Sequence, residues 1–244
     1  MSKGKEMMKE VNVSEKDTEK IPVHCNLAAS YGTLTSASIK ELDENLKVMI
    51  AGTLRKMGKL PDYKWDTVVS CMMQNPLLER IEDSLIHRAD KLIKKGSNFF
   101  KFTGEPDQTI VREVRTWFVN LIADDDVLKD TKIDIDFLAD IVAQTGATVD
   151  SFLTLFGKHE RHERGLVDIG ILRYPEKTMP YFKLYRIKVT AWSDCTRILF
   201  AQDDSNGITG EYHCQKFKPC DEVIAKMKPA IIEKAVDEAE SIFG

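Results

Sequence analysis

The stretch of sequence that decides the fold is Tyr185-Arg186-Ile187-Lys188-Val189-Thr190-Ala191-Trp192. Its apolar and polar residues alternate. The first set is Tyr185, Ile187, Val189 and Ala191, and the second is Arg186, Lys188, Thr190 and Trp192. Because successive side chains of a strand point to opposite faces of a sheet, this period of two predicts a strand with one buried face and one polar face.

The residues around this strand continue the same pattern. Four β-like runs are predicted over 166–173, 182–192, 196–203 and 208–217. The connections between them are short, and one contains Asn206-Gly207, a strong hairpin signal. Parallel neighbours need a crossover of about a dozen residues or more, so the short connections predict an antiparallel meander of four strands.

Helical patterns dominate the chain before this meander. A strand is predicted over 21–29, then a helix over 39–57 that begins with a Ser38–Glu41 capping box. The segment 63–73 is apolar and ambiguous. Further helices are predicted over 78–93, over 107–123 with Asp107 as N-cap, and over about 134–144 and 147–157. A short strand over 99–103 and a C-terminal helix over 221–243 complete the order of elements.

The number of amphipathic helices sets the expected architecture. A sheet with one solvated face needs a single helical layer, whereas five or more helices here carry an apolar stripe to bury. We therefore expect an α+β fold: one domain over 21–244, in which a mostly antiparallel central sheet lies between two helical layers. Residues 1–20 have few apolar side chains and are predicted to form a mobile leader.

Composition narrows the class of protein further. The chain has 244 residues, a net charge of −4 and a pI near 5.8. A dedicated binder of duplex nucleic acid is usually basic, so no nucleic-acid partner is expected. The leader lacks the apolar core of a secretory signal, and no apolar run approaches the ~18 residues of a transmembrane helix. The expectation is a soluble protein that is cytoplasmic or released by a non-classical route.

Three groups of residues could be interpreted as catalytic or metal-binding sites, and each has a simpler structural interpretation. The five cysteines are dispersed and odd in number, so reduced thiols are expected rather than disulfides or zinc ligands. The run Lys158–Arg164 contains two histidines but not the H-E-x-x-H spacing, and it is predicted to be a charged loop. Asp124–Asp126 lack the pattern of a calcium loop and are predicted to be solvated. We expect no enzyme activity, no cofactor and no metal.

The meander is basic within an acidic chain. Residues 181–200 carry Lys183, Arg186, Lys188 and Arg197 against Asp194. Two interpretations stay open at this point. The basic side chains lie at the rim of an ordinary helix-covered sheet, or the strands form a basic amphipathic surface that meets anionic lipid headgroups after their cover is removed.

The meander resembles the Cyt-type cytolytic δ-endotoxins, a family that includes a mushroom cytolysin. The similarity lies in Tyr185–Ala191, in Ile198-Leu199-Phe200, in Gln202-Asp203 with Ser205, and in Lys216-Phe217-Lys218-Pro219. The strand at 167–172 lies at a similar distance before them. Helices 107–123 and 134–157 resemble the paired helices of the family in order and length, whereas residues 21–104 match in element order alone.

This resemblance implies a toxin-like, pore-forming protein that binds phospholipid, inserts strands of its sheet after the helical layers detach, and self-associates on the membrane. The membrane-interaction residues that it suggests are Lys183, Tyr185, Arg186, Ile187, Lys188, Val189, Trp192, Ile198, Leu199 and Phe200. The alternative is a non-enzymatic intracellular binding protein on the same fold, without pore formation. The lysines of 183–188 and the charged 158–164 segment depart from the family and argue against deep insertion.

Overall fold

A computed structural model describes residues 22–95, 106–144, 158–176, 178–198, 201–220 and 222. The strands are β1 (Val23–Ser30), β2 (Leu78–Arg80), β3 (Ile86–Lys95), β4 (Lys158–Tyr174), β5 (Tyr181–Ile198) and β6 (Ala201–Pro219). The helices are α1 (Ala37–Met57), α2 (Trp65–Met73), α3 (Gln108–Ile122), α4 (Asp125–Asp130) and α5 (Ile135–Ala143). The predicted leader, the strand over 99–103 and the helix over 147–157 lie outside the described residues, as does the predicted C-terminal helix apart from Glu222.

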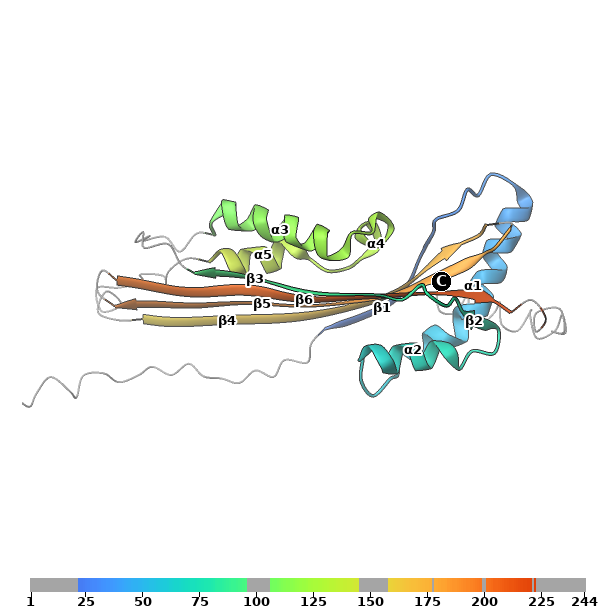
Figure 1. Ribbon diagram of the computed structural model, residues 1–244, viewed down its shortest axis with the longest axis horizontal. Helices are drawn as coiled ribbons and strands as arrows, with labels where there is room; N and C mark the ends of the chain where they lie inside the picture. Colours follow the sequence, from blue (N-terminus) through green and yellow to red (C-terminus); the bar gives the residue numbers. More distant parts are fainter. Residues whose placement is uncertain are drawn as a thin grey trace, which may run out of the picture.

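The six strands form one mixed sheet in the order β1-β4-β5-β6-β2, with β3 also paired to β6. β1 runs parallel to β4, and every other described pair is antiparallel. Helices α3, α4 and α5 cover one face of the sheet, whereas α1 and α2 lie on the opposite face toward one end (Figure 1). The predicted α+β fold, a mostly antiparallel sheet between two helical layers, is therefore confirmed.

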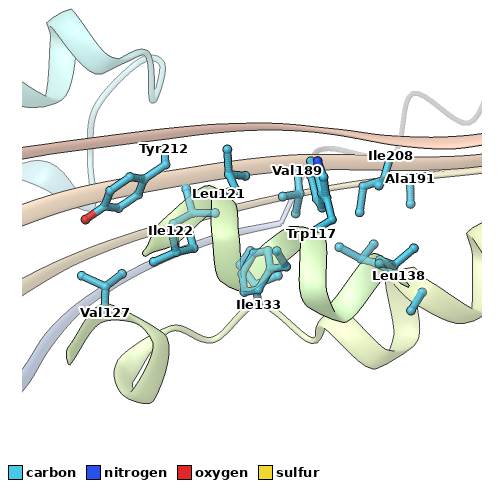
Figure 2. Close-up of a cluster of buried hydrophobic side chains, with 14 of the residues drawn as sticks. Trp117, Leu121, Ile122, Val127, Ile133, Leu138, Val189, Ala191, Ile208 and Tyr212 are labelled. Atoms are coloured by element: carbon cyan, nitrogen blue, oxygen red, sulfur yellow. The ribbon is translucent and has the colours of Figure 1, made fainter. Parts of the chain in front are cut away.

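Each helical layer has its own apolar core. The α3–α5 layer packs on Tyr185, Ile187, Val189 and Ile208 of the sheet. The α1–α2 layer packs on Val167, Ile169, Phe182 and Phe217. Figure 2 shows Trp117 of α3 beside Val189 of the sheet, and Leu121 of α3 nearer to Tyr212. The sheet thus buries alternate residues of the same strands against different helices.

Two helix starts behave as the sequence indicates, and one differs. Asp107 caps α3 by accepting a hydrogen bond from the Thr109 backbone N–H at 2.8 Å, and Asp134 caps α5 in the same way. The capping box predicted at Ser38 is wrong, because α1 begins earlier and Ser36 is its N-cap. The ambiguous segment 63–73 contains α2.

The meander has three long strands instead of the four predicted. The predicted breaks at 193–194 and at Asn206-Gly207 both lie within continuous strands, and Trp192 pairs with Gly207. A Cβ atom at position 207 would lie 2.4 Å from Cζ2 of Trp192, so glycine admits the indole ring. The Asn206 amide donates hydrogen bonds to the backbone carbonyls of Val142 and Gln144 at the end of α5. These two residues serve packing here and form no turn.

The predicted charged loop at 158–164 is also wrong, since it forms the first half of β4. These residues pair with β5 from Lys158↔Arg197 to Arg164↔Ala191. They are charged on both faces because β1 does not reach them: its pairing with β4 begins at Val167. An edge strand tolerates such residues, and charges there discourage non-specific strand pairing.

The helix predicted over 78–93 is replaced by β2 and β3. Its apolar residues fit a helical stripe, but in the structure Arg88 and Asp90 of β3 point to the face of the sheet that lies under α3. Arg88 donates to the backbone carbonyl of Ile122 at the end of α3, and the Trp117 indole N–H donates to Asp90 at 3.0 Å. Arg88 and Asp90 are thus polar residues on a buried strand face, where their partners on α3 satisfy them. The segment is a strand although its sequence lacks the apolar alternation typical of one.

Candidate functional site

The candidate site is the central strand β5 together with the helices that cover it. On the α3–α5 side, Tyr185, Ile187, Val189 and Ala191 are fully buried. On the other side, Phe182 and Leu184 pack under α1 and α2, and the next residues on that side are Arg186, Lys188, Thr190 and Trp192. β5 therefore has an apolar face beneath one helical layer and a face that becomes polar beyond the other.

Lys183 is held by the acidic residues around the start of α4. Its Nζ lies 2.7 Å from Oδ2 of Asp124 and 3.9 Å from Oδ2 of Asp126, with only 10% of the side chain exposed. The ammonium also lies 5.1 Å from the centre of the Tyr174 ring, within cation–π range. With the α3–α5 layer in place, which we call the closed fold, Lys183 joins the sheet to this layer. Its charge is not presented to a surface.

Arg186 is likewise buried, on the opposite face. Its Nε donates to the backbone carbonyl of Tyr63 at 2.6 Å, and its guanidinium pairs with Glu211 of β6 at 3.3 Å. Lys188 and Trp192 lie on the same side of β5, and both are half-buried. Of the three basic residues predicted to contact lipid on this strand, Lys188 is the most accessible in the closed fold.

The remaining residues of the predicted membrane-interaction set lie at the far end of β5. Ile198 ends the strand and pairs with Ala201, the first residue of β6. Leu199 and Phe200, between them in sequence, lie outside the described residues. The structure thus distributes the predicted set over both faces and one end of β5, and does not bring it together on one surface.

A cluster of acids and tyrosines, which the sequence analysis missed, joins α4 to the sheet. The prediction that Asp124–Asp126 are solvated is wrong for Asp124 and Asp126, whose side chains are 17% and 31% exposed. Asp126 accepts a hydrogen bond from the Tyr174 hydroxyl at 2.6 Å, and Asp130 accepts one from Tyr185 at 2.9 Å. Asp124 caps α4 through the Val127 backbone N–H. The signal was present in the sequence, because an aspartate immediately before an apolar helical run is a typical N-cap.

Asp168 lies at the centre of this cluster. Its Oδ2 accepts hydrogen bonds from the Thr131 hydroxyl at 2.7 Å, the Lys132 backbone N–H at 3.0 Å and the Tyr185 hydroxyl at 3.2 Å. Burial raises the pKa of Asp168 despite these donors. Burial, with Asp168 and Asp130 nearby, also raises the pKa of Tyr185. The α4 contact therefore depends on buried polar groups, which are costly to separate from their partners.

A stack of three rings marks the opposite face, beside Arg186. His213 of β6 lies between Trp65 of α2, at 5.0 Å between ring centres, and His87 of β3, at 4.2 Å. Burial, together with His87 and Arg186, lowers the pKa of His213 to about 4. The imidazole is consequently neutral at physiological pH, and it packs as an aromatic ring.

In the described ranges, no three His, Cys, Asp or Glu side chains gather in a way that would hold a metal ion. Within that same part of the chain, none of the helices has the length and apolar character needed to cross a membrane. The cysteines there are free thiols, of which Cys71, Cys195 and Cys214 are buried.

Comparisons with known proteins do not extend this description. No protein-family model matches the chain, and no curated protein matches it significantly.

Proposed function

We propose that this chain is a membrane-active, cytolysin-like protein. It binds phospholipid and inserts strands of its meander after the α3–α5 layer has detached. The observation that carries the proposal is the two-sidedness of β5, on which buried Tyr185, Ile187 and Val189 alternate with the polar face of Arg186, Lys188 and Thr190. Alternation of this kind is typical of strands that face lipid on one side and water on the other.

Strand length supports the same proposal. β5 has 18 residues and β6 has 19, and they pair antiparallel from Phe182↔Phe217 to Ile198↔Ala201. A tilted strand of ~9–11 residues spans a bilayer. The hairpin is therefore long enough to cross a bilayer while residues at both ends remain in water. Pairing satisfies the backbone groups between the two strands, and insertion into lipid requires that their outer edges pair with further strands as well.

Detachment of the α3–α5 layer would expose apolar surface and break the polar α4 contact. Lipid burial of the released face of β5 offsets the first cost, because apolar area removed from water contributes ~25 cal/mol per Å². The second cost includes the separation of Lys183 from Asp124. On this proposal, membrane binding selects an open state that is rare in solution.

A reversible tether between helix and sheet tests the proposal. Lys94 of β3 and Glu113 of α3 form an ion pair across the covered face, so cysteines at both positions can be joined by a short, reducible bifunctional reagent. Replacing the half-buried Cys25 and Cys220 by serine removes the accessible native thiols. We expect dye leakage from anionic liposomes to stop when the tether forms and to return on reduction. The K94C single variant treated with the same reagent is the control, and leakage by the tethered protein contradicts the proposal.

Two lysine variants separate membrane binding from opening. K188Q removes a half-buried charge from the side of β5 opposite the α3–α5 layer and should weaken initial binding to anionic vesicles, since a basic residue near the surface contributes ~1 kcal/mol. K183Q removes the partner of Asp124 and should leave initial binding unchanged while it speeds leakage. If K188Q and K183Q changed binding and leakage equally, the assignment of Lys188 to binding and of Lys183 to opening would be contradicted.

The second candidate function is a non-enzymatic binding protein without pore formation. The burial of Lys183 and Arg186 in ion pairs favours it, as do the charges on both faces of the 158–164 half of β4. A protein of this kind neither binds nor permeabilises liposomes. Absence of both activities in the native chain, with neutral and with anionic vesicles between about pH 5 and 10, would favour this function over the first.

A further inference from the structure

We propose that the edge of β4 over residues 158–166, which no described strand covers, is an interface for a second copy of this chain, which pairs with it antiparallel about His162. The inference goes beyond the proposed function and does not depend on membrane activity. It follows from the length of this edge and from the order of charges along it, which agree on a single register.

The edge is defined by where β1 begins. β5 pairs with β4 along its whole length, from Lys158↔Arg197 to Tyr174↔Tyr181. On the other side, β1 pairs with β4 from Val167 onward, where the Val167 backbone N–H donates to the Pro22 carbonyl at 3.0 Å. Within the described part of the chain, no strand pairs with this side of 158–166. Such an edge presents backbone donors and acceptors to another strand.

The charges along the edge are complementary to their own reversed order. When two copies pair about a two-fold axis through His162, Glu160 faces Arg164 of the second copy and Arg161 faces Glu163 of the second copy, each twice. An axis through either glutamate or either arginine would place two identical charges opposite each other. Opposite charges directly across an antiparallel pair are stabilising and like charges are destabilising, so the charges select the register about His162.

The same register uses the whole edge. His162 is the middle residue of 158–166, so Lys158 of one copy faces Leu166 of the other, and the pairing ends where β1 begins. Charges on an edge strand ordinarily discourage pairing. Here the charges disfavour pairing with neutral strands and pairing in shifted registers, whereas an identical strand in the register about His162 places opposite charges together.

The side chains that decide the register are accessible. Arg161 and Glu163 have exposed fractions of 63% and 53%, and they contact each other at 3.1 Å on one face of β4. His162 is also exposed. In the dimer, each Arg161 exchanges its partner on its own strand for Glu163 of the second copy. Such exposed pairs are screened by salt, so a dimer that weakens as salt is added is expected.

A pair of charge-reversal variants tests the interface. In R161E, glutamate faces Glu163 of the second copy, and in E163R, arginine faces Arg161 of the second copy. We expect each variant alone to dissociate at least about tenfold more readily than the native chain, because two attractive pairs become two repulsive ones. An equimolar mixture restores opposite charges at both places, so it should form a heterodimer. Sedimentation velocity at low and high salt measures all three samples.

Controls separate this interface from an effect on folding. Both variants break the same Arg161–Glu163 contact within the chain, so their thermal unfolding should change equally, whereas mixing restores association alone. The R161E/E163R double variant should self-associate as the native chain does. H162C should form an intermolecular disulfide faster than R161C or E163C, because only residue 162 faces itself. A native chain that stays monomeric, or a mixture that forms no heterodimer, overturns the proposal.

Discussion

The indole nitrogen of Trp117, on α3, donates a hydrogen bond to Oδ2 of Asp90, on β3, at 3.0 Å. The ring itself is 8% exposed and packs in the core beneath the α3–α5 layer. One residue thus provides both an apolar contact and a polar contact between this helical layer and the sheet. Substitutions of Trp117 therefore measure how strongly the α3–α5 layer is bound to the sheet.

We expect W117A to lower the free energy of unfolding by about 3–5 kcal/mol, the range for removing a buried large aromatic side chain. W117F keeps most of the ring contact and loses the hydrogen bond to Asp90, so its cost should be smaller. Urea denaturation of both variants measures the difference. Equal costs for the two substitutions would mean that the hydrogen bond, and not the ring, carries the contact.

Gly210 tests how closely α3 approaches β6. A Cβ atom there would lie 2.4 Å from Cδ2 of Leu121 and 2.8 Å from Cη2 of Trp117. We expect G210A to destabilise the fold by about 1–3 kcal/mol, because overpacking forces the helix away from the strand. G52A is the matched control: no atom lies within 4 Å of its added Cβ in α1, so it should stabilise the fold by up to about 1 kcal/mol. Thermal unfolding that shifts alike in both variants would contradict the close approach.

Arg173 and Asp43 form a buried ion pair that joins β4 to α1. Nε of Arg173 lies 3.0 Å from Oδ1 of Asp43, and both side chains are 6% exposed. Removing Asp43 leaves the buried Arg173 charge uncompensated, so D43L should cost about 3–5 kcal/mol. R173M should cost less, because Lys47 Nζ lies 3.8 Å from Oδ2 of Asp43. The double variant should cost less than the sum of the two, which a double-mutant cycle in urea measures. Strict additivity would show that the pair contributes no coupling.

His213 makes stability depend on pH below neutrality. Burial and the neighbouring His87 and Arg186 lower its pKa to about 4, so the unfolded chain, with a histidine pKa of about 6.5, takes up the proton first. The contribution from neutral His213 is therefore present above about pH 6.5 and is lost as the pH falls toward 4. Glu211 and Asp66, which oppose this shift, also lie near the ring.

We expect H213F to retain the ring stack with Trp65 and to lose this part of the pH dependence. Its melting temperature should therefore fall less than that of the native chain between pH 7 and pH 4.5. An H213F curve parallel to the native one would show that other groups cause the acid loss of stability.

Sequence patterns predicted the layers of this fold better than the limits of its strands. The alternation at Tyr185–Trp192 and the stripe of α3 depend on residues near one another in sequence, and both were correct. Asn206-Gly207 has the composition of a turn, but the α5 carbonyls and the Trp192 ring determine its conformation. Contacts of this kind come from distant segments, and a local pattern does not contain them.

The candidate site shows the same division. That β5 has one apolar and one polar face follows from its alternation. The burial of Lys183 and Arg186 could not be predicted from this alternation, because their partners Asp124 and Tyr63 come from remote segments of the chain. Likewise, the charged run 158–164 indicated a loop, since nothing in the sequence shows that β1 pairs with β4 only from Val167 onward.

The parallel pairing of β1 with β4 has a consequence for how the chain is made. Val23 leaves the ribosome long before Val167, its partner in the sheet. The α1–α2 core also needs Ile169, Phe182 and Phe217, so the N-terminal third of the protein is synthesised before any of its sheet partners exists. Loop closure over such a separation is slow. A nascent chain that stalls before β4 therefore lacks the partners of β1 and of the apolar side of α1, and such exposed surfaces are prone to aggregate.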